Sequence, residues 1–237
     1  MKSIFYSLTL LAFSLLFSNN LLAQTVEETP QKLAARETDL YGGNYSLLVV
    51  ENDQLRKVRH ILDYLLERAH DNAAQNMYKE SAEELKLAAS YMYVDAGRGH
   101  SQFQAEVYEA AENLSTMAAD IDAGAKTPVN DIDAAIFNAH RALARYHQVR
   151  AQTLAEAHLK LQAGMALEAA ALHYDHASIA MARLEGKSLT DTNRDKKVKE
   201  WEKLAQEMIA NSSMSNASTL ELIGRLGTAI NELDAKS

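Results

Sequence analysis

The chain contains no cysteine, and it has only two prolines and nine glycines among its 237 residues. The absence of cysteine excludes a disulfide framework, a thiolate nucleophile, an iron–sulfur cluster and thiolate-bound zinc. Proline and glycine form turns and loops, so their scarcity argues against a β-rich, loop-rich or low-complexity chain. Hydrophobic residues make up 47% of the sequence, which is enough to fill a core.

The charge is predominantly negative, with 32 Asp and Glu against 24 Lys and Arg and a formal net charge of −8. A general nucleic-acid-binding protein needs a basic surface to displace phosphate counterions, so the sequence predicts no nucleic-acid partner. A glycine-rich phosphate loop, a Gly-x-Ser-x-Gly nucleophile motif and a His-Glu-x-x-His zinc-protease motif are all missing from the sequence. We therefore expect a protein without enzymatic activity.

The first 23 residues have the pattern of a secretory signal peptide. Lys2 supplies the positive charge, an apolar run extends from Ile4 to Phe17, and Ala23 precedes the expected cleavage point at Gln24. The run is shorter than the roughly 20 apolar residues of a membrane-spanning helix, although an uncleaved anchor is the alternative. No later segment is continuously apolar, so we predict a periplasmic or secreted protein without a membrane span after cleavage.

Residues 24–45 contain Pro30 and a Gly42-Gly43 pair and show no helical period, which predicts a flexible leader. Beyond the leader, apolar residues recur every three or four positions, and no stretch alternates long enough to be a strand. The pattern predicts an all-α protein of about seven helices. Their expected positions are Leu55–Ala69, Leu85–Met92, Phe103–Ile121, Asn130–Gly164, Met165–Leu184, Asp191–Met208 and Leu220–Leu233.

The glycines between these stripes predict helix ends, at Gly97, Gly124, Gly164 and Gly186. A shift of 89 residues aligns Gly97 with Gly186 and overlays the neighbouring stripes, which suggests a duplicated three-helix unit. We expect a first unit at 46–126 and a second at 127–237 that includes a C-terminal helix, packed as one domain.

The segment 157–184, with a turn near Gly164, resembles a tetratricopeptide-type helical hairpin, although it lacks that family's full Trp/Leu/Gly/Tyr pattern. The stripes and short turns are compatible with an antiparallel helical bundle or with a short tetratricopeptide-like solenoid.

Five of the eight histidines lie between residues 140 and 176. His140, His147 and His158 share one helix face, but helical rise separates neighbouring members by roughly 10 and 16 Å. One ion cannot bridge them, so each would need ligands from another helix. A turn near Gly164 would bring His158 close to His173 and His176, which are neighbours on the following helix.

His158, His173 and His176 are therefore a candidate site for zinc, copper or nickel, with His140 and His147 as a possible second site. Asp175 or Glu156 would be the fourth ligand or would accept a hydrogen bond from a ligating histidine, and Met165 at the turn would favour copper(I). The alternatives are structural histidines at the edge of the core, each with a carboxylate or carbonyl partner, and a pH-responsive cluster.

Two functions remain open from the sequence. The first is a secreted or periplasmic helical binding or scaffold protein that presents a helical face to a protein partner and needs no cofactor. The alternative is a periplasmic metal-binding bundle that uses the clustered histidines.

Overall fold

The computed structural model describes residues 45–97, 103–210 and 215–235, and this part of the chain is all-helical. The predicted signal peptide at 1–23 and the leader at 24–45 lie outside the described residues, apart from Tyr45, where the first described helix begins. The helices are α3 (Tyr45–Ala74), α4 (Tyr78–Ala96), α5 (Gln104–Asp122), α6 (Val129–Glu156), α7 (Lys160–Leu184), α8 (Thr192–Ile209) and α9 (Asn216–Asp234).

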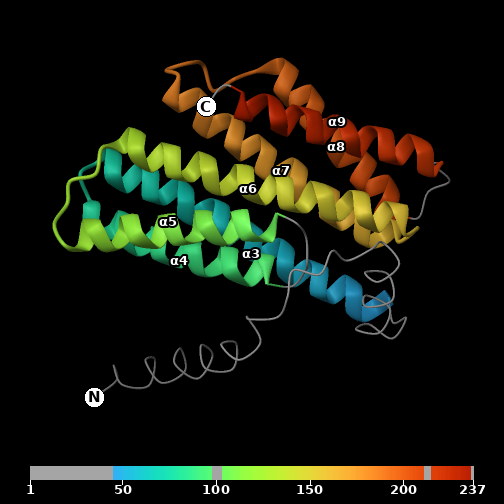
Figure 1. The fold of residues 1–237 in the computed structure, drawn as a ribbon, viewed down its shortest axis with the longest axis horizontal. Coiled ribbons are helices and arrows are strands. Elements are labelled where there is room, and N and C mark those ends of the chain that lie inside the picture. The colour runs from blue at the N-terminus through green and yellow to red at the C-terminus, as the bar shows by residue number, and fades with distance from the viewer. Residues whose placement is uncertain (1–44, 98–102, 211–214, 236–237) are drawn as a thin grey trace.

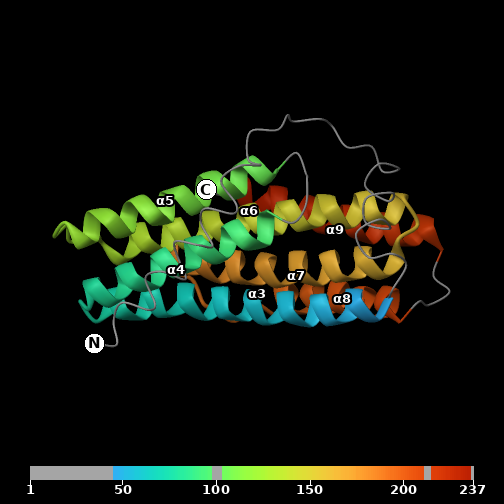
Figure 2. The same ribbon diagram turned by 90° about the horizontal axis from the view of Figure 1, so that it is seen from below.

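The helices lie roughly along one common axis and form an elongated bundle (Figures 1 and 2). α6 and α7 run through its middle, with α3, α4 and α5 on one side and α8 and α9 on the other. α6 contacts α3, α4, α5, α7 and α9, so helices distant in sequence pack against one another. Units of a solenoid contact only their neighbours along the chain, so this packing is that of a closed bundle.

One continuous core contains buried residues from all seven described helices, and alanine is the commonest residue among them. Small side chains allow helices to approach closely. Gly164 in α7 shows how close this approach is: a Cβ atom at this position would lie 2.8 Å from the carbonyl oxygen of Ala205 in α8.

Several predicted helix ends are confirmed. Gly124 and Gly186, after α5 and α7, have positive φ angles of 100° and 61°, a conformation that glycine adopts without strain. Asp191 caps α8 by accepting a hydrogen bond of 2.9 Å from the backbone N–H of Asn193. α6 begins one residue before the expected Asn130, at Val129, directly after Pro128.

The predicted turn at Gly164 is wrong. α6 ends at Glu156, the chain turns through 157–159, and Gly164 lies inside α7. At this turn His158, and not a glycine, adopts the left-handed conformation, with a φ angle of 61°. The glycine is needed instead for the close approach of α7 to α8.

The internal duplication is not confirmed. Gly97 and Gly186 do follow α4 and α7 and are 89 residues apart, as the repeat requires. The turns that precede these two helices contain Asn76 and His158, both with positive φ, and these are only 82 residues apart. The two helices therefore differ in length, with 19 residues in α4 and 25 in α7.

The division into units at 46–126 and 127–237 stays a prediction. None of the helices formed by residues 45–97, 103–210 and 215–235 is both long and apolar enough to cross a lipid bilayer.

Candidate functional site

Four helices bring ionisable side chains together inside the apolar core. Asp63 comes from α3, Asp95 from α4, His140 and His147 from α6, and His173 from α7, and all five are buried. His140 and His147 are two helical turns apart, so they point in the same direction. Asp63 lies close to His140 and His173, and Asp95 lies close to His147 and His173. We call these five residues the buried cluster.

The first part of the buried cluster consists of Asp63, His140 and His173. The Nδ1 atoms of the two histidines are 3.2 Å apart. The Oδ1 atom of Asp63 lies 3.6 Å from Nδ1 of His173 and 3.8 Å from Nδ1 of His140. A point equidistant from these three atoms lies about 2.1 Å from each, which is the usual bond length from zinc to nitrogen or oxygen.

Burial is the dominant influence on the Asp63 carboxyl group. Both of its oxygens are buried, and neither has a hydrogen-bond partner among the described residues. Burial raises the pKa of Asp63 from 3.8 to about 8, and the attraction of Arg59 offsets only part of this rise. Burial also holds the pKa values of His140 and His173 well below 6.5, so both imidazoles are neutral at pH 7 and can act as ligands.

The second part of the buried cluster, formed by Asp95, His147 and His173, has a different charge balance. Nε2 of His147 lies 2.9 Å from Oδ2 of Asp95, and Nε of Arg59 lies 3.6 Å from the same oxygen. Burial by itself would raise the pKa of Asp95, but the attraction of His147, Arg59 and His173 lowers it overall. Asp95 is therefore an ionised carboxylate that already has a cation beside it.

The imidazole rings form a continuous row. The ring centroids of His147 and His173 are 5.7 Å apart, those of His173 and His140 are 5.4 Å apart, and those of His140 and His176 are 5.0 Å apart. His176 is the member nearest to solvent, because 29% of its side chain is exposed. The row therefore connects the protein surface with the centre of the bundle.

The structure brings together four of the five sequence-predicted histidines. His173 and His176 lie close to Asp63, and His140 and His147 lie on either side of His173 along the row. His158 is not part of this group, since it is exposed and lies in the turn before α7. At helical rise, His158 is about 20 Å from His173 along the bundle.

The other predicted ligands also point elsewhere. Asp175 pairs with Arg194, at 3.0 Å between Oδ1 and Nε. Glu156 is exposed and accepts a hydrogen bond from Gln152. Met165 is buried in α7, but eight residues, or about 12 Å of helix, separate it from His173.

Neither carboxylate of the buried cluster is among the site residues predicted from the sequence. Asp63 lies next to Leu62 and three residues before Leu66, within the apolar stripe of α3. Asp95 has the same kind of position, between Met92 and Ala96 on the buried face of α4. A charged residue at a position where the helical period expects an apolar one was the sequence signal that could have identified both carboxylates.

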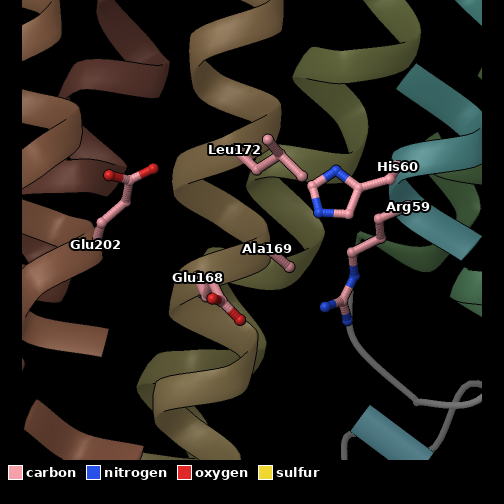
Figure 3. A pocket seen from close by; sticks show the side chains of 6 residues that line it. All are labelled: Arg59, His60, Glu168, Ala169, Leu172 and Glu202. Atoms are coloured by element: carbon pink, nitrogen blue, oxygen red, sulfur yellow. The ribbon is translucent and has the colours of Figure 1, made fainter. Parts of the chain in front are cut away.

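A small pocket of about 100 Å³ lies between α3, α7 and α8 (Figure 3). Arg59 lies at its edge and also contacts Asp95, so the pocket adjoins the buried cluster. It can hold only a few water molecules and is smaller than an ordinary small-molecule site. The residues that line it are Arg59, His60, Glu168, Ala169, Leu172 and Glu202.

Comparison of the chain with protein-family models, with curated proteins and with solved structures finds no match. The functional argument therefore depends on the geometry of the buried cluster.

Proposed function

We propose that the protein binds one divalent transition-metal ion through Asp63, His140 and His173. The observation that carries the proposal is the buried Asp63 carboxyl group, which has no hydrogen-bond partner among the described residues and whose Oδ1 atom lies within 4 Å of two imidazole nitrogens. Because burial raises the pKa of Asp63 to about 8, the carboxyl group holds a proton at pH 7, and an ion at the centre of this triangle would displace that proton and stabilise the ionised carboxylate.

The Asp95 group is the weaker candidate, although its donor atoms also lie close together. Arg59 already supplies a positive charge to Asp95 through a contact of 3.6 Å. A metal ion bound there would have to share the carboxylate with the guanidinium group, and the two cations would repel each other. We therefore assign Asp95 and Arg59 a structural role, in which they orient His147.

The donor set is compatible with several divalent transition-metal ions. Two imidazole nitrogens and one carboxylate oxygen suit zinc, nickel and copper(II), and the same combination also binds iron(II). Copper(I) prefers soft sulfur ligands, and Met165 is too far from the cluster to provide one. We propose zinc as the first ion to test.

Thermal unfolding of the purified protein, freed of metal with a chelator and then supplied with each ion in turn, tests the proposal. An ion that binds only the folded state at a hundredfold excess over its dissociation constant adds about 2.7 kcal/mol of stability. For a domain of this size, that corresponds to a rise in Tm of about 5–10 °C.

Substitutions identify the ligands. We expect His140→Ala and His173→Ala to abolish the zinc-dependent rise in Tm, whereas His158→Ala keeps it, because His158 lies in the distant turn. A wild-type Tm that no ion changes would refute metal binding. A rise that His158→Ala abolishes would instead support the ligand set predicted from the sequence.

A helical face that docks a protein partner is the second candidate. Four large apolar side chains on α3 and α4 are exposed: Tyr64 by 58%, Leu87 by 51%, Val94 by 48% and Ile61 by 40%. We propose that the variants Tyr64→Ser and Leu87→Ser lose any partner that the wild-type protein captures from a periplasmic extract. Capture that is equal for wild type and variants would remove this face from consideration.

A further inference from the structure

His176 differs from the other residues around Asp63 in its access to solvent. Its side chain is 29% exposed, whereas those of His140, His173 and Asp63 are 2%, 0% and 7% exposed. Its ring stacks on that of His140, with 5.0 Å between centroids and 20° between ring planes. His176 is therefore the member of this group that a hydrated ion can reach first.

The two oxygens of Asp63 face different imidazole groups. Oδ1 lies near the Nδ1 atoms of His140 and His173, at 3.8 and 3.6 Å. Oδ2 lies 3.6 Å from Nε2 of His176. One carboxyl group thus borders two neighbouring places for a cation, an inner one that is fully buried and an outer one beside the partly exposed histidine.

The acidic groups that act on His176 from its surroundings already have partners. Asp175 forms an ion pair with Arg194, and Glu67 forms one with Arg183. Among the described residues, the two oxygens of Asp63 have no hydrogen-bond partner, and one of them lies 3.6 Å from Nε2 of His176. An ion that arrives at His176 therefore finds its next oxygen ligand on Asp63 and not at the surface.

We infer that His176 and Oδ2 of Asp63 form an outer cation position through which the metal ion reaches and leaves the inner position. The ion exchanges a water molecule for Nε2 of His176, binds Oδ2 of Asp63, and passes to Oδ1 and the Nδ1 atoms of His140 and His173. The carboxyl group of Asp63 gives its proton to water as the ion binds, and the hydrogen that one Nδ1 atom contributes to the contact between His140 and His173 moves to Nε2 of the same ring. The inference rests on the proposed metal binding and adds the route of the ion.

The experiment uses cobalt(II), whose visible absorbance reports nitrogen coordination, and the variant His176→Gln. Stopped-flow mixing measures the rate of uptake, and excess chelator measures the rate of release. We expect both rates to fall by about tenfold, which is about 1.4 kcal/mol in the barrier, while the dissociation constant changes much less. His158→Ala is the control and keeps the wild-type rates.

Two results would overturn the inference. One is uptake and release at wild-type rates in His176→Gln. The other is weaker binding that arises from faster release alone, because His176 would then be an ordinary ligand of the inner ion. If the wild-type protein shows no cobalt absorbance, the proposed function fails as well. Loss of absorbance in His140→Ala together with wild-type rates in His176→Gln would reject only the route.

Discussion

Replacement of Asp63 by asparagine should stabilise the metal-free protein. In the folded chain, burial raises the pKa of Asp63 from 3.8 to about 8, so the carboxyl group stays protonated at pH 7 while the unfolded chain releases that proton. A raised folded pKa means that this group's contribution to stability is complete below pH 4 and is lost as the pH rises toward 8. The loss amounts to about 4 kcal/mol at pH 7 and about 2 kcal/mol at pH 5.

Asparagine has nearly the same shape and does not ionise, so Asp63→Asn avoids this loss. Urea unfolding followed by circular dichroism, with a chelator present, measures the free energy of unfolding for both proteins at pH 5, 6, 7 and 8. We expect the advantage of the variant over wild type to grow by about 2–3 kcal/mol between pH 5 and pH 7. The same variant should gain nothing from zinc, because it lacks the carboxylate.

Asp95→Asn is the matched control, since it changes the other buried carboxyl group. Asp95 is ionised and pairs with Arg59 and His147, so its neutralisation leaves a buried guanidinium without its partner. Breaking such a pair costs about 3–5 kcal/mol, and the variant should be less stable than wild type at pH 7. A difference between wild type and Asp63→Asn that stays constant with pH would refute the account of Asp63.

Two further predictions concern packing and the histidines. Gly164→Ala should lower the free energy of unfolding by about 1–3 kcal/mol, because its Cβ would lie 2.8 Å from the carbonyl oxygen of Ala205. At Gly224 an added Cβ atom would meet no neighbouring atom within 4 Å, so Gly224→Ala should raise the free energy of unfolding by up to about 1 kcal/mol. Thermal unfolding of both variants compares these two changes in stability. In the Asp63→Asn background, stability should fall as the pH drops from 7 to 5, by up to about 2 kcal/mol for each histidine that stays neutral in the folded chain. Burial lowers the pKa values of His140 and His173 in the folded chain, so the unfolded chain takes up protons first as the pH falls. The urea concentration at the midpoint of unfolding should therefore decrease from pH 7 to pH 5.

The helical architecture was predictable because its signals are local. A period of three to four residues marks each described helix, and Gly124, Gly186 and Asp191 act at the ends where sequence rules expect them. The turn after α6 was misplaced because two local signals competed. Glycine at position 164 reads as a helix terminator, but the structure uses it for a close helix crossing, and His158 makes the turn.

Periodicity correctly placed His140 and His147 on one face of α6. The imidazole that lies against His140 belongs to His173 in α7. The position of Asp63 opposite His173 could not be predicted, because it depends on how α3 docks on α6 and α7. Sequence spacing carries no information on that docking, so the contact between Asp63 and His173 is known only from the folded chain.

The alanines that flank the histidines on α6 and α7 help to set the distances between the imidazole rings of the buried cluster. Ala144 and Ala151 on α6, and Ala170 and Ala177 on α7, are fully buried. Their methyl groups allow the two helices to lie close enough for imidazole rings from both to meet. A bulkier residue at any of these positions would push the helices apart and pull the nitrogen atoms beyond the reach of a single ion. A random mutagenesis screen for lost zinc binding should therefore return these alanine codons alongside the histidine codons.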